Sequence, residues 1–153
     1  MLTVQLTSDV EVRIKSALRR FGPRETGGIL LAEHTGCNHF TVREVTVHGR
    51  GTIATFVRHV RDAVSSIAAF FRRTGHNYRK FNYLGEWHSH PSFHPSPSLK
   101  DDDAMRRIVG DEAVGATFAV LLVVKLDLDG RLVGTAHTYL PDGTKQESML
   151  ATE

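Results

Sequence analysis

The stretch GEWHSHPSFHPSPSLKDDD covers Gly85–Asp103 and concentrates three histidines, three prolines and three consecutive aspartates. The prolines favour an extended loop over Pro91–Pro97, because proline fixes φ and has no backbone N–H to donate. The residues before the loop, Asn82–His88, have the pattern of a strand, and a helix is predicted from Ser98 to about Val109. Imidazoles at a strand end and carboxylates at the next helix start suit a metal site, since histidine is the commonest metal ligand.

The histidines and aspartates of this stretch have a spacing that suits metal binding. His88 and His90 stand two positions apart, so their side chains point to the same face of a strand. Zinc binds such nitrogens at ~2.0–2.1 Å, and a catalytic site needs a third protein ligand and an open fourth position. Asp101, on the first helical turn, can face back toward the strand end. Asp102 and Asp103 point about 100° and 200° farther round the helix.

Each of these residues also has a plain structural interpretation. Ser98 could support a developing oxyanion, but Ser98-x-x-Asp101 is also a capping-box pattern that can simply start a helix. Two histidines at this spacing are more often packed or solvated than bound to metal. His94, inside the loop, is either a spare ligand or a solvated residue. The residues alone leave both interpretations open.

Glu25 is the candidate general base for a metal-bound water. It stands in a turn after Gly22-Pro23 and just before the apolar run GGILLA, where Gly27 and Gly28 let backbones approach closely. The alternatives are that Glu25 is an ordinary surface acid and that Glu86, two residues before His88, supports the metal ligands from behind.

Length and composition bound the class of protein. The chain has 153 residues, 41% hydrophobic and 24% charged, with a net charge of +2. These values are typical of one globular domain and give little reason to expect nucleic-acid binding. One cysteine, Cys37, excludes an internal disulfide and a multi-thiolate metal site. No signal-peptide pattern or membrane-length apolar run is present, so a cytoplasmic protein is expected.

Apolar periodicity predicts alternating strands and helices. Helices are expected from an N-cap at Ser8 to Phe21, over about Val60–Phe71, and after Ser98. Strands are expected at Thr3–Leu6, Gly27–Ala32, Phe40–Val47, Thr55–His59, Asn82–His88, Phe118–Leu126 and Leu132–Tyr139. The pattern predicts an α/β fold with a mixed sheet and helices on its faces. Residues 1–140 would form the domain, and the polar residues 141–153 a frayed C-terminal tail.

Taken together, the polar residues resemble the signature of the JAMM (MPN+, or JAB) zinc metalloproteases. The matching pattern is His88-x-His90-Pro91, then Ser98-x-x-Asp101, with Glu25 upstream before a Gly-Gly-apolar strand. The sequence leading into it, Tyr83–Trp87, is similar to that of small prokaryotic JAB peptidases. The resemblance covers nearly the whole chain, from about Met1 to Tyr139. It implies a fold similar to that of cytidine deaminases, a curved mixed sheet flanked by about three helices.

The resemblance also implies a role for each residue of the motif. His88, His90 and Asp101 would bind one catalytic Zn²⁺, with a water in the fourth position. Glu25 would take a proton from that water and return it to the leaving amine. Ser98 would support the oxyanion. The expected enzyme is an isopeptidase or peptidase that cleaves after the C-terminus of a ubiquitin-like protein, in deconjugation or precursor processing.

The cellular partners follow from the resemblance as well, and alternatives remain. Small bacterial enzymes of this kind often accompany ubiquitin-like conjugation enzymes in antiphage defence operons, whereas others process sulfur-carrier proteins. The extended tail of the substrate would add to an exposed sheet edge, between loops at Gly49–Thr55 and His76–Lys80. A different class of function is an inactive binding module, in which a basic cluster contacts nucleic acid. The cluster comprises Arg72, Arg73, Arg79 and Lys80.

Overall fold

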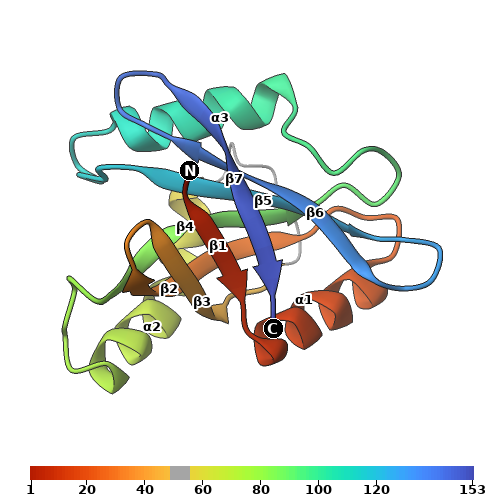
Figure 1. Ribbon diagram of the computed structural model, residues 1–153, viewed down its shortest axis with the longest axis horizontal. Helices are drawn as coiled ribbons and strands as arrows, with labels where there is room; N and C mark the ends of the chain where they lie inside the picture. Colours follow the sequence, from red (N-terminus) through yellow and green to blue (C-terminus); the bar gives the residue numbers. More distant parts are fainter. Residues whose placement is uncertain (49–55) are drawn as a thin grey trace.

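The computed structural model describes residues 1–48 and 56–153 of the chain. The described part contains seven strands and three helices. Their order along the chain is β1 (Thr3–Leu6), α1 (Ser8–Phe21), β2 (Gly27–Gly36), β3 (His39–Val45), α2 (Phe56–Arg73), β4 (Phe81–Ser89), α3 (Leu99–Gly110), β5 (Ala119–Leu126), β6 (Leu132–Tyr139) and β7 (Lys145–Thr152) (Figure 1). The predicted α/β class is confirmed.

The strands form a closed barrel in the order β1-β3-β2-β4-β5-β6-β7. The pairs β1–β3, β1–β7 and β4–β5 are parallel and the other four pairs are antiparallel, so the predicted mixture of strand directions is confirmed. The expectation of a curved sheet is wrong, because β7 pairs with both β6 and β1 and so closes the sheet into a barrel. Every described strand therefore has two neighbours, and none offers the free edge expected for a substrate tail.

The C-terminal residues are the source of this difference. A frayed tail was expected after Pro141, but Lys145–Thr152 form β7. The strand carries few apolar residues, and its only fully buried side chain is Ser148, whose hydroxyl lies 2.7 Å from the hydroxyl of Thr138. A strand that buries a hydroxyl pair gives no alternation of apolar and polar residues for a sequence pattern to detect.

Alternating residues of the central strands serve two different apolar cores. Val120, Leu122 and Val124 of β5 point into the barrel, where they pack with α1. Leu121 and Val123 point outward against α3. In the same way, α2 covers the outward residues of β2 and β4. Because successive strand residues face opposite sides, the barrel has a filled interior and carries α2 and α3 on its outer surface (Figure 1).

Two helix starts differ from their predicted positions. The N-cap of α1 is Thr7, whose hydroxyl accepts a hydrogen bond from the N–H of Val10, and Ser8 is the first helical residue. The short strand predicted at Thr55–His59 is wrong from Phe56 onward, because α2 begins there. Helical spacing already begins at Phe56, so the sequence itself carried this signal. Thr55 and the loop predicted at 49–52 lie outside the described residues.

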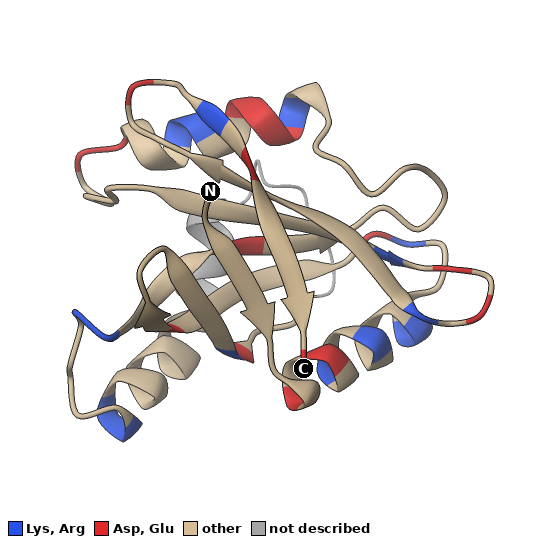
Figure 2. Cartoon of the chain, in the orientation of Figure 1, with Lys and Arg blue, Asp and Glu red and all other residues tan. Residues whose placement is uncertain are grey.

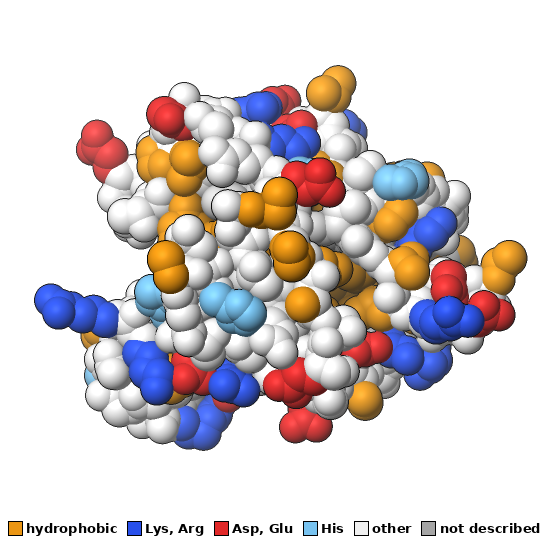
Figure 3. Space-filling model, in the orientation of Figure 1, with side chains coloured by type: hydrophobic (Ala, Val, Ile, Leu, Met, Phe, Trp, Pro, Cys, Tyr) orange, Lys and Arg blue, Asp and Glu red, His pale blue; other side chains and the backbone are white. Residues whose placement is uncertain are grey.

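Charged side chains are spread over several elements. Figure 2 shows acidic residues at the start of α1 and basic residues along the rest of it, both kinds on α3, and basic residues near the end of α2. Two members of the basic cluster are paired: Arg73 with Glu44, and Lys80 with Glu33 at 3.2 Å. The face that presents β1 and β7 has scattered apolar atoms at its centre and charged side chains around its periphery (Figure 3). No helix within residues 1–48 and 56–153 is long and apolar enough to cross a membrane.

Candidate metal centre

The histidine pair lies on the outer surface of the barrel, at the C-terminal end of β4. Trp87 belongs to the interior core, so its neighbours Glu86 and His88 point outward. His90 follows the strand directly, and its N–H donates to the carbonyl of Val124 on β5, which keeps the backbone in place beyond the last strand residue. Because α2 packs on β2 and β4, and α3 on β5, both imidazoles lie between these helices.

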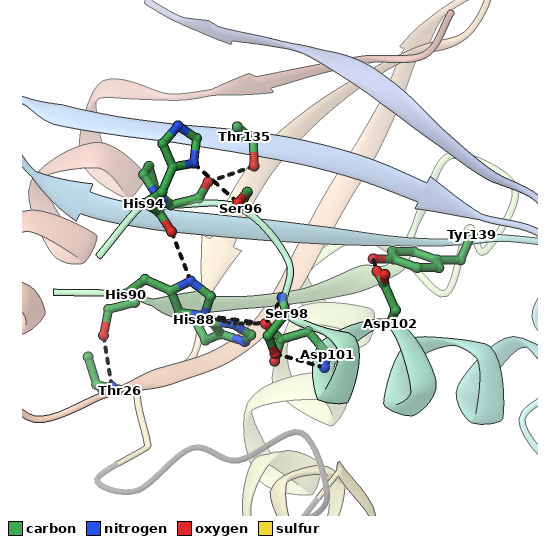
Figure 4. A network of polar contacts seen from close by, with 12 residues as sticks. Thr26, His88, His90, His94, Ser96, Ser98, Asp101, Asp102, Thr135 and Tyr139 are labelled. Atoms are coloured by element: carbon green, nitrogen blue, oxygen red, sulfur yellow. Dashed lines mark hydrogen bonds and ion pairs between the residues drawn. The ribbon is translucent and has the colours of Figure 1, made fainter. Parts of the chain in front are cut away.

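Three polar atoms from the end of β4, the residue after it and the start of α3 converge at this point. The Nε2 atoms of His88 and His90 are 3.0 Å apart. The Oδ2 atom of Asp101 lies 3.2 Å from the first and 3.3 Å from the second. All three residues are buried, and they form a group that could hold a metal ion (Figure 4). The structure thus brings together the three residues that the spacing suggested as ligands.

The distances among these three atoms fit tetrahedral coordination of a metal ion. Ligand atoms bound at ~2.0–2.1 Å in a tetrahedron are roughly 3.3 Å apart, which agrees with the three measured distances. The orientation of the His90 ring fits as well. Its Nδ1 lies 3.2 Å from the carbonyl oxygen of His94, and a carbonyl only accepts, so Nδ1 carries a proton and Nε2 is the ring nitrogen that faces His88 and Asp101. The donor set of two imidazoles and one carboxylate is one that zinc uses in catalytic sites.

Asp101 owes its position to the helix cap. Ser98 accepts a hydrogen bond from the Asp101 N–H at 3.2 Å, and its own N–H donates to Asp101 Oδ2 at 2.8 Å. The capping box predicted as a structural interpretation is therefore present, and the same carboxylate oxygen faces the imidazoles. Burial raises the pKa of Asp101, but hydrogen bonds to His88 and His90 outweigh it and hold this pKa well below its usual range. The carboxylate is ionised, as a metal ligand must be.

The proline loop between the ligands is anchored to the barrel. Thr135 on β6 donates to the carbonyl of Pro95 at 2.7 Å, and the Ser96 N–H donates to the carbonyl of His94 at 2.9 Å. The ring of Phe93 lies against the ring of His90, with centroids 4.3 Å apart. The imidazole of His94 is exposed and outside the group, so its contribution is the backbone carbonyl that holds His90 (Figure 4).

Strand pairing places Glu25 beside the histidine pair. Gly27 is the pairing partner of His88. One residue earlier, Thr26 accepts from the Ser89 N–H at 2.8 Å and donates its own N–H to the Ser89 hydroxyl at 2.9 Å. Continuing this register sets Glu25 opposite His90, where partners share a face. Glu25 is exposed, as a residue that handles water and substrate would be.

The negative charge of Glu25 contributes to the raised pKa of His90. Burial lowers the pKa of His90, but Asp101, the carbonyl of His94 and the charge of Glu25 together raise it above its ordinary value. Glu86 differs from Glu25 because only 3% of its surface is exposed. Burial raises the pKa of Glu86 to about 8, and its Oε1 has no hydrogen-bond partner among the described residues. The exposed glutamate is thus the better placed of the two to exchange protons with a substrate.

Gly27 and Gly28 allow the close approach that was expected from the sequence. A Cβ atom on Gly27 would meet the carbonyl of Trp87 and would lie 2.9 Å from the Cβ of His88. A Cβ on Gly28 would overlap the carbonyl of Thr46. Strand β2 therefore fits between its neighbours only without side chains at these positions, and this fit brings Glu25 to the ligands.

Gly27→Ala is expected to lower the free energy of unfolding of the metal-free protein by about 2 kcal/mol, because overpacking forces β2 away from β4. Urea unfolding measures the change. Gly110→Ala is the matched control, since nothing lies within 4 Å of the added Cβ there. An unchanged midpoint for Gly27→Ala would contradict the close approach.

The loop at His76–Lys80 was predicted as a wall of the substrate groove, but it lies away from the three converging residues. Its residues Tyr78–Lys80 line a cavity of about 560 Å³ together with the start of β4 and residues 114–118. None of the three converging residues lines that cavity, because they lie at the opposite end of β4. The other predicted wall, Gly49–Thr55, lies outside the described residues.

Comparison with known proteins gives the family. Residues 7–138 match the family described as prokaryotic homologs of the JAB domain. The chain belongs to this prokaryotic JAB family. The match spans α1 to β6 and includes the convergent histidines and aspartate, so the resemblance expected from the motif is confirmed.

Relatives and a solved structure agree with this assignment. A Vibrio cholerae protein named CD-NTase/cGAS isopeptidase is 36% identical over 94 residues, 59% of this chain and 58% of that protein. An Enterobacter hormaechei protein of the same name is 28% identical over 134 residues, 85% of this chain and 71% of that protein. The alignment thus spans less than two thirds of the Vibrio relative's length.

A solution structure of a Desulfitobacterium hafniense protein has a TM-score of 0.65, with 18% identity. The structural match covers 98% of this chain and 92% of the Desulfitobacterium hafniense chain. This likeness supports the fold alone.

Proposed function

We propose that this prokaryotic JAB protein is a zinc-dependent isopeptidase that cleaves after the C-terminus of a ubiquitin-like protein. The observation that carries the proposal is the convergence of His88, His90 and Asp101, with atoms 3.0–3.3 Å apart, beside the register position of Glu25. The names of the two relatives, which are isopeptidases, support the reaction class.

The proposed chemistry divides among four kinds of group. A zinc ion held by the three ligands would lower the pKa of a bound water to roughly 7 and polarise the scissile carbonyl. Glu25 takes a proton from the attacking water and delivers it to the leaving amine, which suits an exposed carboxylate beside the centre. Ser98 uses only a lone pair of its hydroxyl oxygen in the helix cap, so its proton remains available to the developing oxyanion.

The substrate and setting are also part of the proposal. Isopeptide bonds join a C-terminal carboxyl group to a lysine amine, and a ubiquitin-like modifier supplies such a C-terminus. We propose conjugation enzymes of the same bacterium as partners, an antiviral defence role and a cytoplasmic location. The isopeptidase names of the two bacterial relatives support a protein-conjugate substrate and therefore conjugation enzymes as partners.

A cleavage assay tests the reaction. The zinc-loaded protein is incubated with a ubiquitin-like modifier from the same genome, joined to a target lysine, and the products are weighed by mass spectrometry. We expect release of the modifier with an intact C-terminus, and no release by Glu25→Gln. Cleavage only of sulfur-carrier fusions would replace the proposed substrate class, and no cleavage of either by a metal-loaded protein would contradict the isopeptidase proposal.

Phe93 is expected to contact the substrate next to the scissile bond. Its ring packs on His90 and is 50% exposed, so it presents apolar surface at the entrance to the centre. Burying such a ring under a substrate residue contributes ~1.5–3 kcal/mol. Phe93→Ala should therefore raise KM by about tenfold with an unchanged metal content. Val12→Ala, an exposed apolar residue on α1, is the control, and an unchanged KM for Phe93→Ala would contradict the contact.

A further inference from the structure

The three consecutive aspartates at the start of α3 have three different surroundings. Asp101 faces the imidazoles. Asp103 is exposed, and its nearest basic partner is Arg106 at 3.9 Å. Asp102 is 9% exposed and points toward the barrel. Because residues on a helix are separated by about 100°, one turn of α3 contacts the candidate metal centre on one side and the barrel wall on another.

Asp102 is held by two side chains of the barrel. The Tyr139 hydroxyl donates to Asp102 Oδ1 at 2.6 Å (Figure 4). The Lys145 ammonium lies 2.8 Å from Oδ1 and 3.1 Å from Oδ2. Burial and the neighbouring carboxylate raise the pKa of Tyr139, so the phenol keeps its proton and remains a donor. Both carboxylate oxygens of Asp102 therefore have charged or strong hydrogen-bond partners.

The two partners form a rigid unit of the barrel. Tyr139 ends β6, Lys145 begins β7, and the two residues are direct pairing partners in the antiparallel ladder. Tyr139 has no exposed surface and packs with Met105, Ile108 and Val109 of α3. The carboxylate of Asp102 is thereby tied to the part of the sheet that closes the barrel.

A small rotation of α3 about its axis would move the carboxylate of Asp101 relative to His88 and His90. A side-chain atom ~5 Å from the helix axis moves roughly 1.7 Å when the helix turns by about 20°. Metal–ligand distances tolerate only about 0.2 Å. The capping box fixes Asp101 against its own turn of helix, but it does not fix that turn against the barrel, which carries the two histidines.

We propose that Asp102, Tyr139 and Lys145 form an anchor that sets the rotation of α3, so that the Asp101 carboxylate meets His88 and His90. The inference rests on the proposed metal-dependent function and goes beyond it: strand β7 becomes a positioning element of the metal centre. The alternative is that the buried ion pair contributes only to stability, which such pairs often do weakly. The two accounts differ in what happens to metal affinity in the folded protein.

The experiment compares zinc affinity, metal spectrum and stability in the full chain. The variants are Lys145→Met, Tyr139→Phe, which keeps the buried ring, and Lys145→Arg, which keeps the charge. Arg131→Met is the matched control, because it removes an exposed ion pair with Asp129. Zinc dissociation constants come from competition with a chromophoric chelator, the ligand field from the visible spectrum of the Co²⁺-loaded protein, and stability from urea unfolding.

Partners behind a metal ligand typically contribute 10–100-fold to metal affinity. We expect Lys145→Met and Tyr139→Phe to weaken zinc binding by about tenfold or more and to change the Co²⁺ spectrum. We expect Lys145→Arg to retain much of the wild-type zinc affinity, because it keeps the charge. We expect Arg131→Met to bind zinc as tightly as the wild type. Variants that are less stable but bind zinc with wild-type affinity and an unchanged spectrum would overturn the anchor. A wild-type protein that binds no zinc would overturn the proposed function itself.

Discussion

Glu25→Gln is expected to lower kcat by about 10²–10⁴-fold while zinc stays bound, because glutamine cannot take a proton from the attacking water. Glutamine keeps the size and exposure of the side chain, so the pairing of Thr26 with Ser89 should remain. The measurement is the rate of cleavage of an isopeptide-linked conjugate, with the zinc content determined on the same sample.

Two further variants make this result specific. Glu147→Gln changes an exposed acid on β7 and should retain wild-type activity. Glu86→Gln removes the buried acid of β4, which we expect to be less important for proton transfer because it is nearly inaccessible. Full activity in Glu25→Gln together with a large loss in Glu86→Gln would assign the base to Glu86 and contradict the assignment made from strand register.

His88→Ala is expected to abolish both zinc binding and cleavage. Two remaining donors do not form a closed site, since catalytic zinc needs about three protein ligands. Metal analysis after dialysis should show a loss from about one zinc per chain to a small fraction of that value. Asp101→Ala should give the same loss, but it also removes the capping box of α3, which costs roughly 1 kcal/mol of stability.

His88→Ala is therefore a cleaner test of the ligand set than Asp101→Ala. Its fold can be checked by far-UV circular dichroism, and His94→Ala provides a control with an exposed imidazole outside the group. The His94 variant keeps the backbone carbonyl that accepts from His90, so it should retain zinc. Zinc loss in His94→Ala equal to that in His88→Ala would contradict the assignment of the three ligands.

The local parts of the site were predictable from the sequence. His88 and His90 share a face because strand side chains alternate, and Asp101 faces back because of its place in the first helical turn after Ser98. The close packing at Gly27 and Gly28 could also be predicted, because two glycines before an apolar strand allow backbones to approach closely. These inferences need only the geometry of single elements and one short loop.

The parts that depend on distant residues were not predictable. Strand β7 buries Ser148 against Thr138, and a buried hydroxyl pair resembles a polar tail in the sequence. The anchor of Asp102 joins residues 37 and 43 positions apart, so no local pattern indicates it. The carbonyl of His94 that orients His90 carries no sequence signal, since every residue has a carbonyl. Barrel closure follows from β7 and was missed with it.

The central claim is that His88, His90 and Asp101 hold a catalytic zinc ion. Elemental analysis with X-ray absorption spectroscopy at the zinc edge, on the purified wild-type protein, tests it most directly. The account predicts about one zinc per chain, with two imidazole nitrogens and oxygen donors at ~2.0–2.1 Å. Little zinc even after addition of the metal, or a spectrum without imidazole ligands, would contradict it.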